Sequence, residues 1–202
     1  LHRLIFYKSV ALRYGYGWGH THHDNLNVEF WARGQAVVPE LGYPNWVHPS
    51  GSTAQAVHHI TGMIDHRDQY HRATGKGALE LFAGAPEASF VDVSARPAGF
   101  PARVYRRAVA LLEAPGRNTY ALDILRLQGG KTRTYCFHGP PFDDFQCGLP
   151  FGPKGETLFS NLLEPQQATS DADVLADWKY ENQPLRLRLT MLGQAGRRYV
   201  TA

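Results

Sequence analysis

The sequence predicts an all-β fold, an antiparallel multi-stranded β-sandwich, and three observations favour this class. Short runs of alternating or β-branched residues recur, turn-forming residues separate them, and helical periodicity is nearly absent from the 202 residues. With 43% hydrophobic residues, the chain can bury a substantial core, and one all-β domain of this length is ordinary. We therefore expect a single β-sandwich domain over residues 1–202.

The strand-like runs are residues 26–33, 78–82, 88–93, 103–112, 119–127, 132–137 and 185–192. Hairpin signals connect several of them. Residues 114–118, Ala-Pro-Gly-Arg-Asn, join two runs, and Gly129-Gly130 joins the next pair. These signals predict an antiparallel meander. A sandwich is the natural way for so many strands to cover each other's apolar faces.

The remaining segments are read from their turn-forming and capping residues. Residues 139–168 hold five prolines and several glycines, so we expect long loops there. Residues 170–178 are compatible with one or two helical turns, with Asp171 or Asp173 as the cap. The weak helical periodicity elsewhere argues against a helical bundle.

Composition and the distribution of charged and apolar residues limit the kinds of partner that we expect for this chain. The formal net charge is +3, from 21 basic and 18 acidic residues, and no basic run is long enough to favour nucleic acid. No stretch of 18 apolar residues predicts a membrane span. The chain begins without Met or a signal-peptide layout and reads as an excised piece. Cys136 and Cys147 lack CxxC spacing, and both a disulfide and two free thiols stay open.

Histidine is concentrated near the start of the chain, where nine of the ten fall within the first 71 residues. The densest part is Gly-His-Thr-His-His-Asp at residues 19–24, followed by Glu40 and by His58-His59. If residues 20–24 are extended, His20 and His22 share one face. His23 then points to the opposite face, where we expect a structural role.

This cluster has the residue types of a zinc site. Zinc commonly takes two imidazoles and a carboxylate, with water as the fourth ligand, and His22, Glu40 and His59 would make such a set. His58 is an alternative to His59, because adjacent strand residues face opposite ways. Solvated or core-capping histidines are the competing interpretation.

Three motifs resemble the β-sandwich domain of heparinase II/III-like polysaccharide lyases. They are Gly-His-x-His-x-Asp-x-Leu at 19–26, Gly-Tyr-Pro at 42–44, and His-x-Thr-x-x-Ile-Asp at 59–65. Residues 105–109, 122–124, 129–131 and 137–139 also resemble successive strands of that family. The resemblance extends from about residue 15 to residue 200.

The resemblance implies the C-terminal half of a larger lyase whose N-terminal (α/α) toroid is absent here. It implies that His20 is the catalytic histidine directed into the cleft between toroid and sandwich. His22 and His59 would hold a structural Zn²⁺ with Glu40, which stands where the family usually has Asp and is one methylene longer. The family's enzymes also imply a periplasmic or secreted location.

The implied reaction is β-elimination in a uronic-acid polysaccharide such as a glycosaminoglycan or alginate. It needs a base for the C5 proton, neutralisation of the sugar carboxylate, and a proton for the leaving oxygen. His20 suits the first or the second role, whereas the rest belongs to the toroid, so we expect little activity from this chain alone. Tyr16 and Trp18 are candidates for stacking on sugar rings, with ordinary packing as the alternative.

Two other functions fit parts of the sequence. The ligand set by itself is compatible with a zinc-dependent hydrolase that activates a metal-bound water. The missing toroid residues are compatible with a non-catalytic carbohydrate-binding sandwich.

Overall fold

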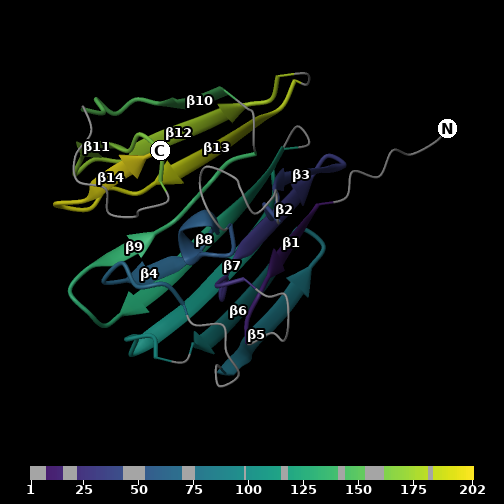
Figure 1. Ribbon diagram of the computed structural model, residues 1–202. Helices are drawn as coiled ribbons and strands as arrows, with labels where there is room; N and C mark the ends of the chain where they lie inside the picture. Colours follow the sequence, from purple (N-terminus) through teal and green to yellow (C-terminus); the bar gives the residue numbers. More distant parts are fainter. Residues whose placement is uncertain are drawn as a thin grey trace. The chain divides into compact units, whose positions relative to one another are not determined.

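The computed structural model describes residues 8–15, 22–42, 53–69, 76–97, 99–114, 118–140, 144–152, 162–181 and 184–202 (Figure 1). Apart from one short 3-10 helix, the regular structure in these ranges consists of strands in several antiparallel sheets, so the chain is all-β. The chain divides into two compact units: residues 1–44 with 52–138, and residues 45–51 with 139–202. A single sandwich domain stays a prediction.

The first unit contains three sheets. The largest is a four-stranded antiparallel sheet in chain order: β5 (Lys76–Ala85), β6 (Ala88–Arg96), β7 (Val104–Ala114) and β8 (Asn118–Gln128). The second joins β1 (Ser9–Leu12), β2 (Val28–Ala32) and β3 (Gln35–Val38). The third pairs β4 (Gly62–Ile64) with β9 (Arg133–Tyr135), and the 3-10 helix η1 (Ala56–His58) precedes β4.

One face of the four-stranded sheet forms the core of this unit. Side chains alternate between the two faces of a strand, and the buried cluster comprises Leu26, Val93, Ala95 and Tyr105. Partly buried residues from β1 and β8 pack against it, among them Leu12 and Leu125. The loop before β2 is therefore anchored through Leu26 to β6 and β7.

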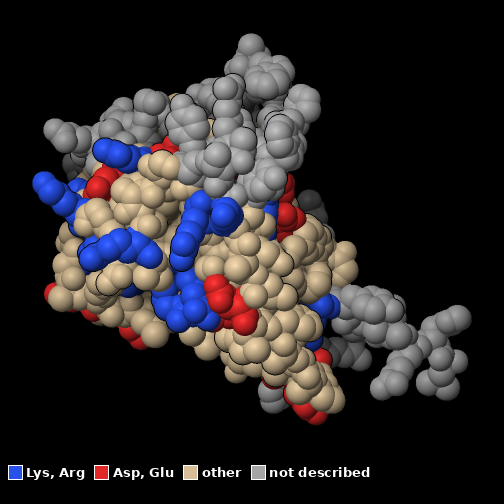
Figure 2. All heavy atoms as spheres, turned by 90° about the horizontal axis from the view of Figure 1, so that it is seen from below, with Lys and Arg blue, Asp and Glu red and all other residues tan. Residues whose placement is uncertain are grey.

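The opposite face of this sheet has an apolar part and a basic part. One row of cross-strand neighbours is apolar: Ala83, Phe90, Ala110 and Leu122. Two rows further along, Arg106 lies directly opposite Arg126, and both bind Asp92. Figure 2 shows a face of the molecule on which basic side chains gather beside a broad area with few charges.

The hairpin predicted at residues 114–118 is confirmed, because β7 and β8 pair with Ala114 opposite Asn118. The hairpin predicted at Gly129-Gly130 is wrong, since β9 pairs with β4 rather than with β8. Asp65, just after β4, accepts the backbone N–H groups of Lys131 (2.7 Å) and Thr132 (2.9 Å). These bonds hold the start of β9 against the end of β4.

The second unit contains a three-stranded antiparallel sheet of β10 (Asp144–Cys147), β12 (Val174–Lys179) and β13 (Arg186–Met191). A separate pair joins β11 (Gln166–Thr169) to β14 (Arg198–Thr201). Residues 139–168 are thus not loops throughout, because they include β10 and most of β11.

The helical turns expected over residues 170–178 are also wrong. Burial alternates with a period of two along β12, where Val174, Ala176 and Trp178 are buried, as in a strand. Asp171 and Asp173 cap no helix. They accept the backbone N–H groups of Gly196 (2.7 Å) and Gly193 (2.6 Å), and so fix the turn between β13 and β14.

Both cysteines are free thiols, so of the two open alternatives the structure has no disulfide. Burial raises the pKa of the Cys136 thiol to about 12, which keeps it protonated at neutral pH. No helix in the described ranges has the length and apolar character needed to cross a bilayer.

Candidate metal centre

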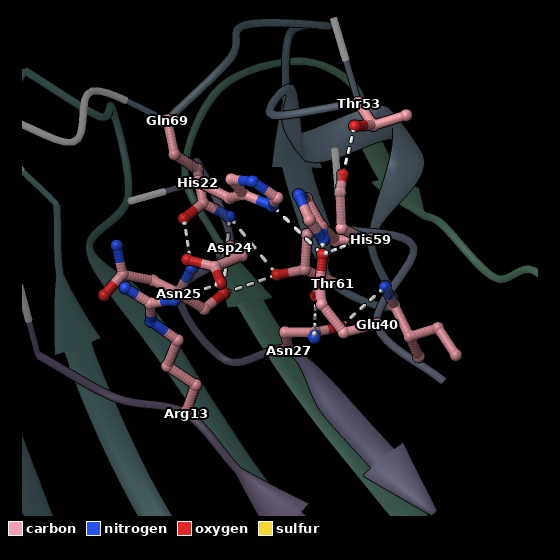
Figure 3. A network of polar contacts seen from close by, with 12 residues as sticks. Arg13, His22, Asp24, Asn25, Asn27, Glu40, Thr53, His59, Thr61 and Gln69 are labelled. Atoms are coloured by element: carbon pink, nitrogen blue, oxygen red, sulfur yellow. Dashed lines mark hydrogen bonds and ion pairs between the residues drawn. The ribbon is translucent and has the colours of Figure 1, made fainter. Parts of the chain in front are cut away.

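His22, Glu40 and His59 converge although they are far apart in the sequence (Figure 3). Nδ1 of His22 lies 3.0 Å from Oε1 of Glu40, and Nδ1 of His59 lies 3.2 Å from Oε2. The two imidazole rings are 5.1 Å apart between centroids. One ligand atom from each residue lies within 4.8 Å of the other two.

Three different segments supply these side chains. His22 lies in the loop before β2, Glu40 follows β3, and His59 follows η1. At η1 the choice between neighbouring histidines is decided: His58 ends the 3-10 turn and is half-buried, whereas His59 is fully buried against Glu40. The sequence had left this choice open.

Asn27 ties two of these segments together. Its Nδ2 donates to Oε2 of Glu40 (3.2 Å), and its Oδ1 accepts the backbone N–H of Ile60 (2.9 Å). The backbone N–H of Gly42 also donates to Glu40 Oε1 (3.3 Å). These bonds set the direction of the carboxylate and hold the segment with His59 beside it, which is how partners of metal ligands act.

The charges at the site favour an ionised Glu40. Burial raises the pKa of this carboxyl, but the close contact with His59 and the nearby His22 outweigh burial and lower the pKa to about 2. Nearby, burial raises the pKa of Asp24, although Arg13 at 2.6 Å opposes this shift. Glu40 therefore presents a carboxylate to the two imidazoles over the whole neutral and mildly acidic range.

The buried imidazole of His59 has ring nitrogens that lack hydrogen-bond partners among the described residues. It is 0% exposed, and neither ring nitrogen has a hydrogen-bond partner among the residues that the structure describes. Nδ1 is close to Glu40 Oε2 but lacks hydrogen-bond geometry. A buried polar atom without a partner is costly, so the environment of His59 favours a ligand that can use its lone pair.

This donor set could hold a metal ion, and its geometry can be compared with that of zinc. Zinc binds imidazole nitrogen and carboxylate oxygen at about 2.1 Å, which places tetrahedral ligands roughly 3.4 Å apart. Nδ1 of His22 and Nδ1 of His59 already lie 3.0 and 3.2 Å from the oxygens of Glu40, so only the wider spacings, up to 4.8 Å, have to shorten. Soft thiolate ligands play no part, since Cys136 and Cys147 are not in the cluster.

No family model matches this sequence, and no curated protein matches it. The resemblance to heparinase II/III-like lyases therefore stays a prediction from the motif residues.

The structure describes only some of the other residues that were singled out in the sequence. His20, Tyr16 and Trp18 lie outside the described residues. His23 contacts the carboxylate of Asp68, away from the metal cluster, in keeping with a structural role. The side chain of Asp24 accepts a hydrogen bond from Arg13.

Sequence reasoning missed the buried polar network next to the site. The Tyr105 hydroxyl donates to the backbone oxygen of Asn25 (2.7 Å), and Gln69 Nε2 donates to that hydroxyl (2.6 Å). Gln69 Oε1 also accepts the backbone N–H of Asn25 (2.9 Å), so that Asn25, Gln69 and Tyr105 are all joined by hydrogen bonds. The loop between His22 and β2 is thus fixed from the side of β7.

Arg107 carries a buried charge rather than a solvated one. It is 1% exposed and binds Asp123 through two parallel hydrogen bonds of 2.8 and 2.6 Å. The sequence did contain a signal, because Tyr105 and Val109 alternate with it on the apolar face of the strand. No comparable signal marks Asn27.

Proposed function

We propose that this chain is the zinc-binding β-domain of a periplasmic or secreted lyase that cleaves a uronic-acid polysaccharide by β-elimination. Zn²⁺ is held by His22, Glu40 and His59 in a structural role. The observation that carries the metal assignment is the convergence of these residues from three segments, with His59 buried and lacking a hydrogen-bond partner among the described residues. The family resemblance supports the lyase assignment.

Burial favours a structural over a catalytic metal. His22 is 7% exposed and His59 is 0% exposed, and Asn27 occupies one flank of Glu40. Three protein ligands leave a fourth position for water, as in catalytic zinc sites, but a catalytic zinc also needs access for a substrate, and burial of both imidazoles opposes that access. When bound, the ion would supply a positive centre that cross-links the loop before β2, the end of β3 and the segment after η1.

The structural metal has a consequence for His20. Only one residue separates His20 from His22, so an ion that fixes His22 restricts the region that His20 can reach. In the lyase mechanism His20 then neutralises the sugar carboxylate or takes the C5 proton. The zinc itself takes no part in the proton transfer.

Metal content tests the site directly. The chain purified from zinc-containing medium should hold close to one zinc per molecule by mass spectrometry of the metal. His22→Gln and His59→Gln should lose most of it, whereas the matched control His58→Gln should retain it. Equal loss in His58→Gln and His59→Gln, or a wild-type chain that takes up no zinc at micromolar concentrations, would refute the assignment.

Product chemistry tests the reaction. The full-length protein should release unsaturated uronate ends from an acidic polysaccharide, detected by their ultraviolet absorbance. His20→Ala should abolish this product and leave the zinc content unchanged. New reducing ends without unsaturation would instead support the zinc-dependent hydrolase, and binding of an oligouronate without turnover would support a carbohydrate-binding sandwich.

A further inference from the structure

Strand β5 (Lys76–Ala85) lies at one edge of the four-stranded sheet. Among the described strands it pairs with β6 alone, and all ten of its residues are exposed. Leu79 and Leu81 are each 51% exposed, and Phe82 is 68% exposed. Among the described residues, the outer edge of this strand therefore offers backbone N–H and C=O groups without a strand partner, together with apolar side chains, which is the template for adding another strand.

The usual protection of a sheet edge is weak here. Proteins block such edges with proline, several charges, strong bulges or a covering segment. β5 contains no proline, and its charged residues are Lys76 and Glu80. A bulge at Glu80, between Leu79 and Leu81, interrupts the register, so the flat part of the edge runs from Lys76 to Leu79.

The two charges of β5 lie at the start of this flat part and in the bulge that ends it, Lys76 and Glu80, and this arrangement suits pairing with a second copy. We propose that β5 pairs antiparallel with β5 of a second copy of the chain, around a two-fold axis beside Ala78. In this register Lys76 faces Glu80 of the second copy, and the symmetry repeats the pair. Gly77 likewise faces Leu79 of the second copy, at a position where the backbone of Gly15 in the same chain packs closely against Gly77.

The present sheet gives an independent reason for this register. Within the chain, Lys76 lies directly opposite Arg96 on β6, and like charges at such positions are destabilising. Glu80 is on the same face, since its carboxylate accepts a hydrogen bond from Ser94 Oγ (2.6 Å), and Ser94 is two residues before Arg96. In the dimer, Glu80 of the second copy lies beside Lys76 and offsets this repulsion.

The proposal is independent of zinc and of lyase activity. Light scattering after gel filtration should give a mass near twice 22.6 kDa for the full chain at tens of micromolar. Glu80→Lys should weaken dimerisation about tenfold, because Lys76 then faces another lysine in both symmetry-related pairs. The double variant Lys76→Glu/Glu80→Lys should restore it. Ser94→Ala, which removes the same hydrogen bond but keeps the charge, is the control and should remain dimeric.

A cross-link locates the contact. Ala78→Cys in a Cys147→Ser background should form a disulfide-linked dimer on mild oxidation, since directly opposite residues have Cβ atoms about 5 Å apart. The Cys147→Ser background alone should not. A chain that is monomeric at all concentrations overturns the proposal. A dimer that tolerates Glu80→Lys and fails to cross-link at position 78 overturns it as well.

Discussion

Arg107 donates from one guanidinium nitrogen to the backbone oxygens of both Leu26 (2.5 Å) and Ile60. Leu26 belongs to the loop that carries His22, and Ile60 follows His59. A single buried side chain of β7 therefore joins two of the segments that form the candidate zinc site. Asp123 on β8 holds the guanidinium in place by two hydrogen bonds and supplies its counter-charge.

Removal of that counter-charge should be costly. Asp123→Ala leaves a buried guanidinium unpaired, and we expect the free energy of unfolding to fall by about 3 kcal/mol, the lower end for broken buried pairs because Asp123 is 25% exposed. The exposed bidentate pair of Arg188 and Asp177 is the control, and Asp177→Ala should cost less than about 1 kcal/mol. Urea titrations measure both. Equal losses in the free energy of unfolding would contradict a special role for the buried pair of Arg107 and Asp123.

The affinity for zinc should depend on Asn27, which is not a ligand. Asn27→Ala removes the bond to Glu40 and the acceptor for the Ile60 N–H, and the loss of such a partner typically lowers metal affinity by about tenfold or more. Competition with a chromophoric chelator measures it. His23→Gln, in the same loop but paired with Asp68, should leave the affinity unchanged. Similar losses in both variants would point to general loosening of the loop.

Asp92 should contribute stability that depends on pH. The hydrogen bonds from Arg106 lower the pKa of this carboxyl, burial opposes the shift, and Arg126 lowers it further. Because the folded pKa is depressed, the stabilisation is complete above the unfolded value near 4 and is lost as the pH falls through the folded value. Asp92→Asn should therefore destabilise the protein at pH 7 and much less at a strongly acidic pH below the folded value. Denaturant midpoints at both pH values give the comparison, and a constant difference would exclude this linkage.

Gly130 should not tolerate a side chain. Its φ is +53°, and a Cβ would collide with the side chains of Ile64 and Asp65, the residues that hold β9 to β4. Gly130→Ala should lower the free energy of unfolding by about 2 kcal/mol. Gly84 on β5 has open space around it and no positive φ, so Gly84→Ala should change stability by less than about 0.5 kcal/mol. Thermal or urea unfolding distinguishes the two.

Local sequence patterns predict one sheet well and the others poorly. The meander of β5 to β8 has long alternating runs joined mostly by short turns, so each strand pairs with its neighbour in the chain. Residues 174–179 were misread because Leu, Ala and a preceding Asp also suit a helix. They form a strand because β10 and β13 pair with both sides, which no local pattern reveals.

The candidate site shows the same division. Histidines and carboxylates are visible in the sequence as ligand types, and His22, Glu40 and His59 could be named from them. Asn27 could not, because an asparagine in a loop is most often a turn residue. The sequence also left His58 and His59 equivalent, and the 3-10 turn of η1 separates them by the direction in which each side chain leaves the backbone.

By itself, the sequence determined that this chain is all-β, that its middle forms a meander, and which side chains are chemically able to bind a metal. These properties depend on residue type and on spacing over a few residues. Only the tertiary structure decided that β9 pairs with β4, that the buried Arg107 binds the backbone of two separate segments, and that His59 faces Glu40. Each of these depends on contacts between segments far apart in the chain, and their free energy is gained only when the packed core brings those segments together.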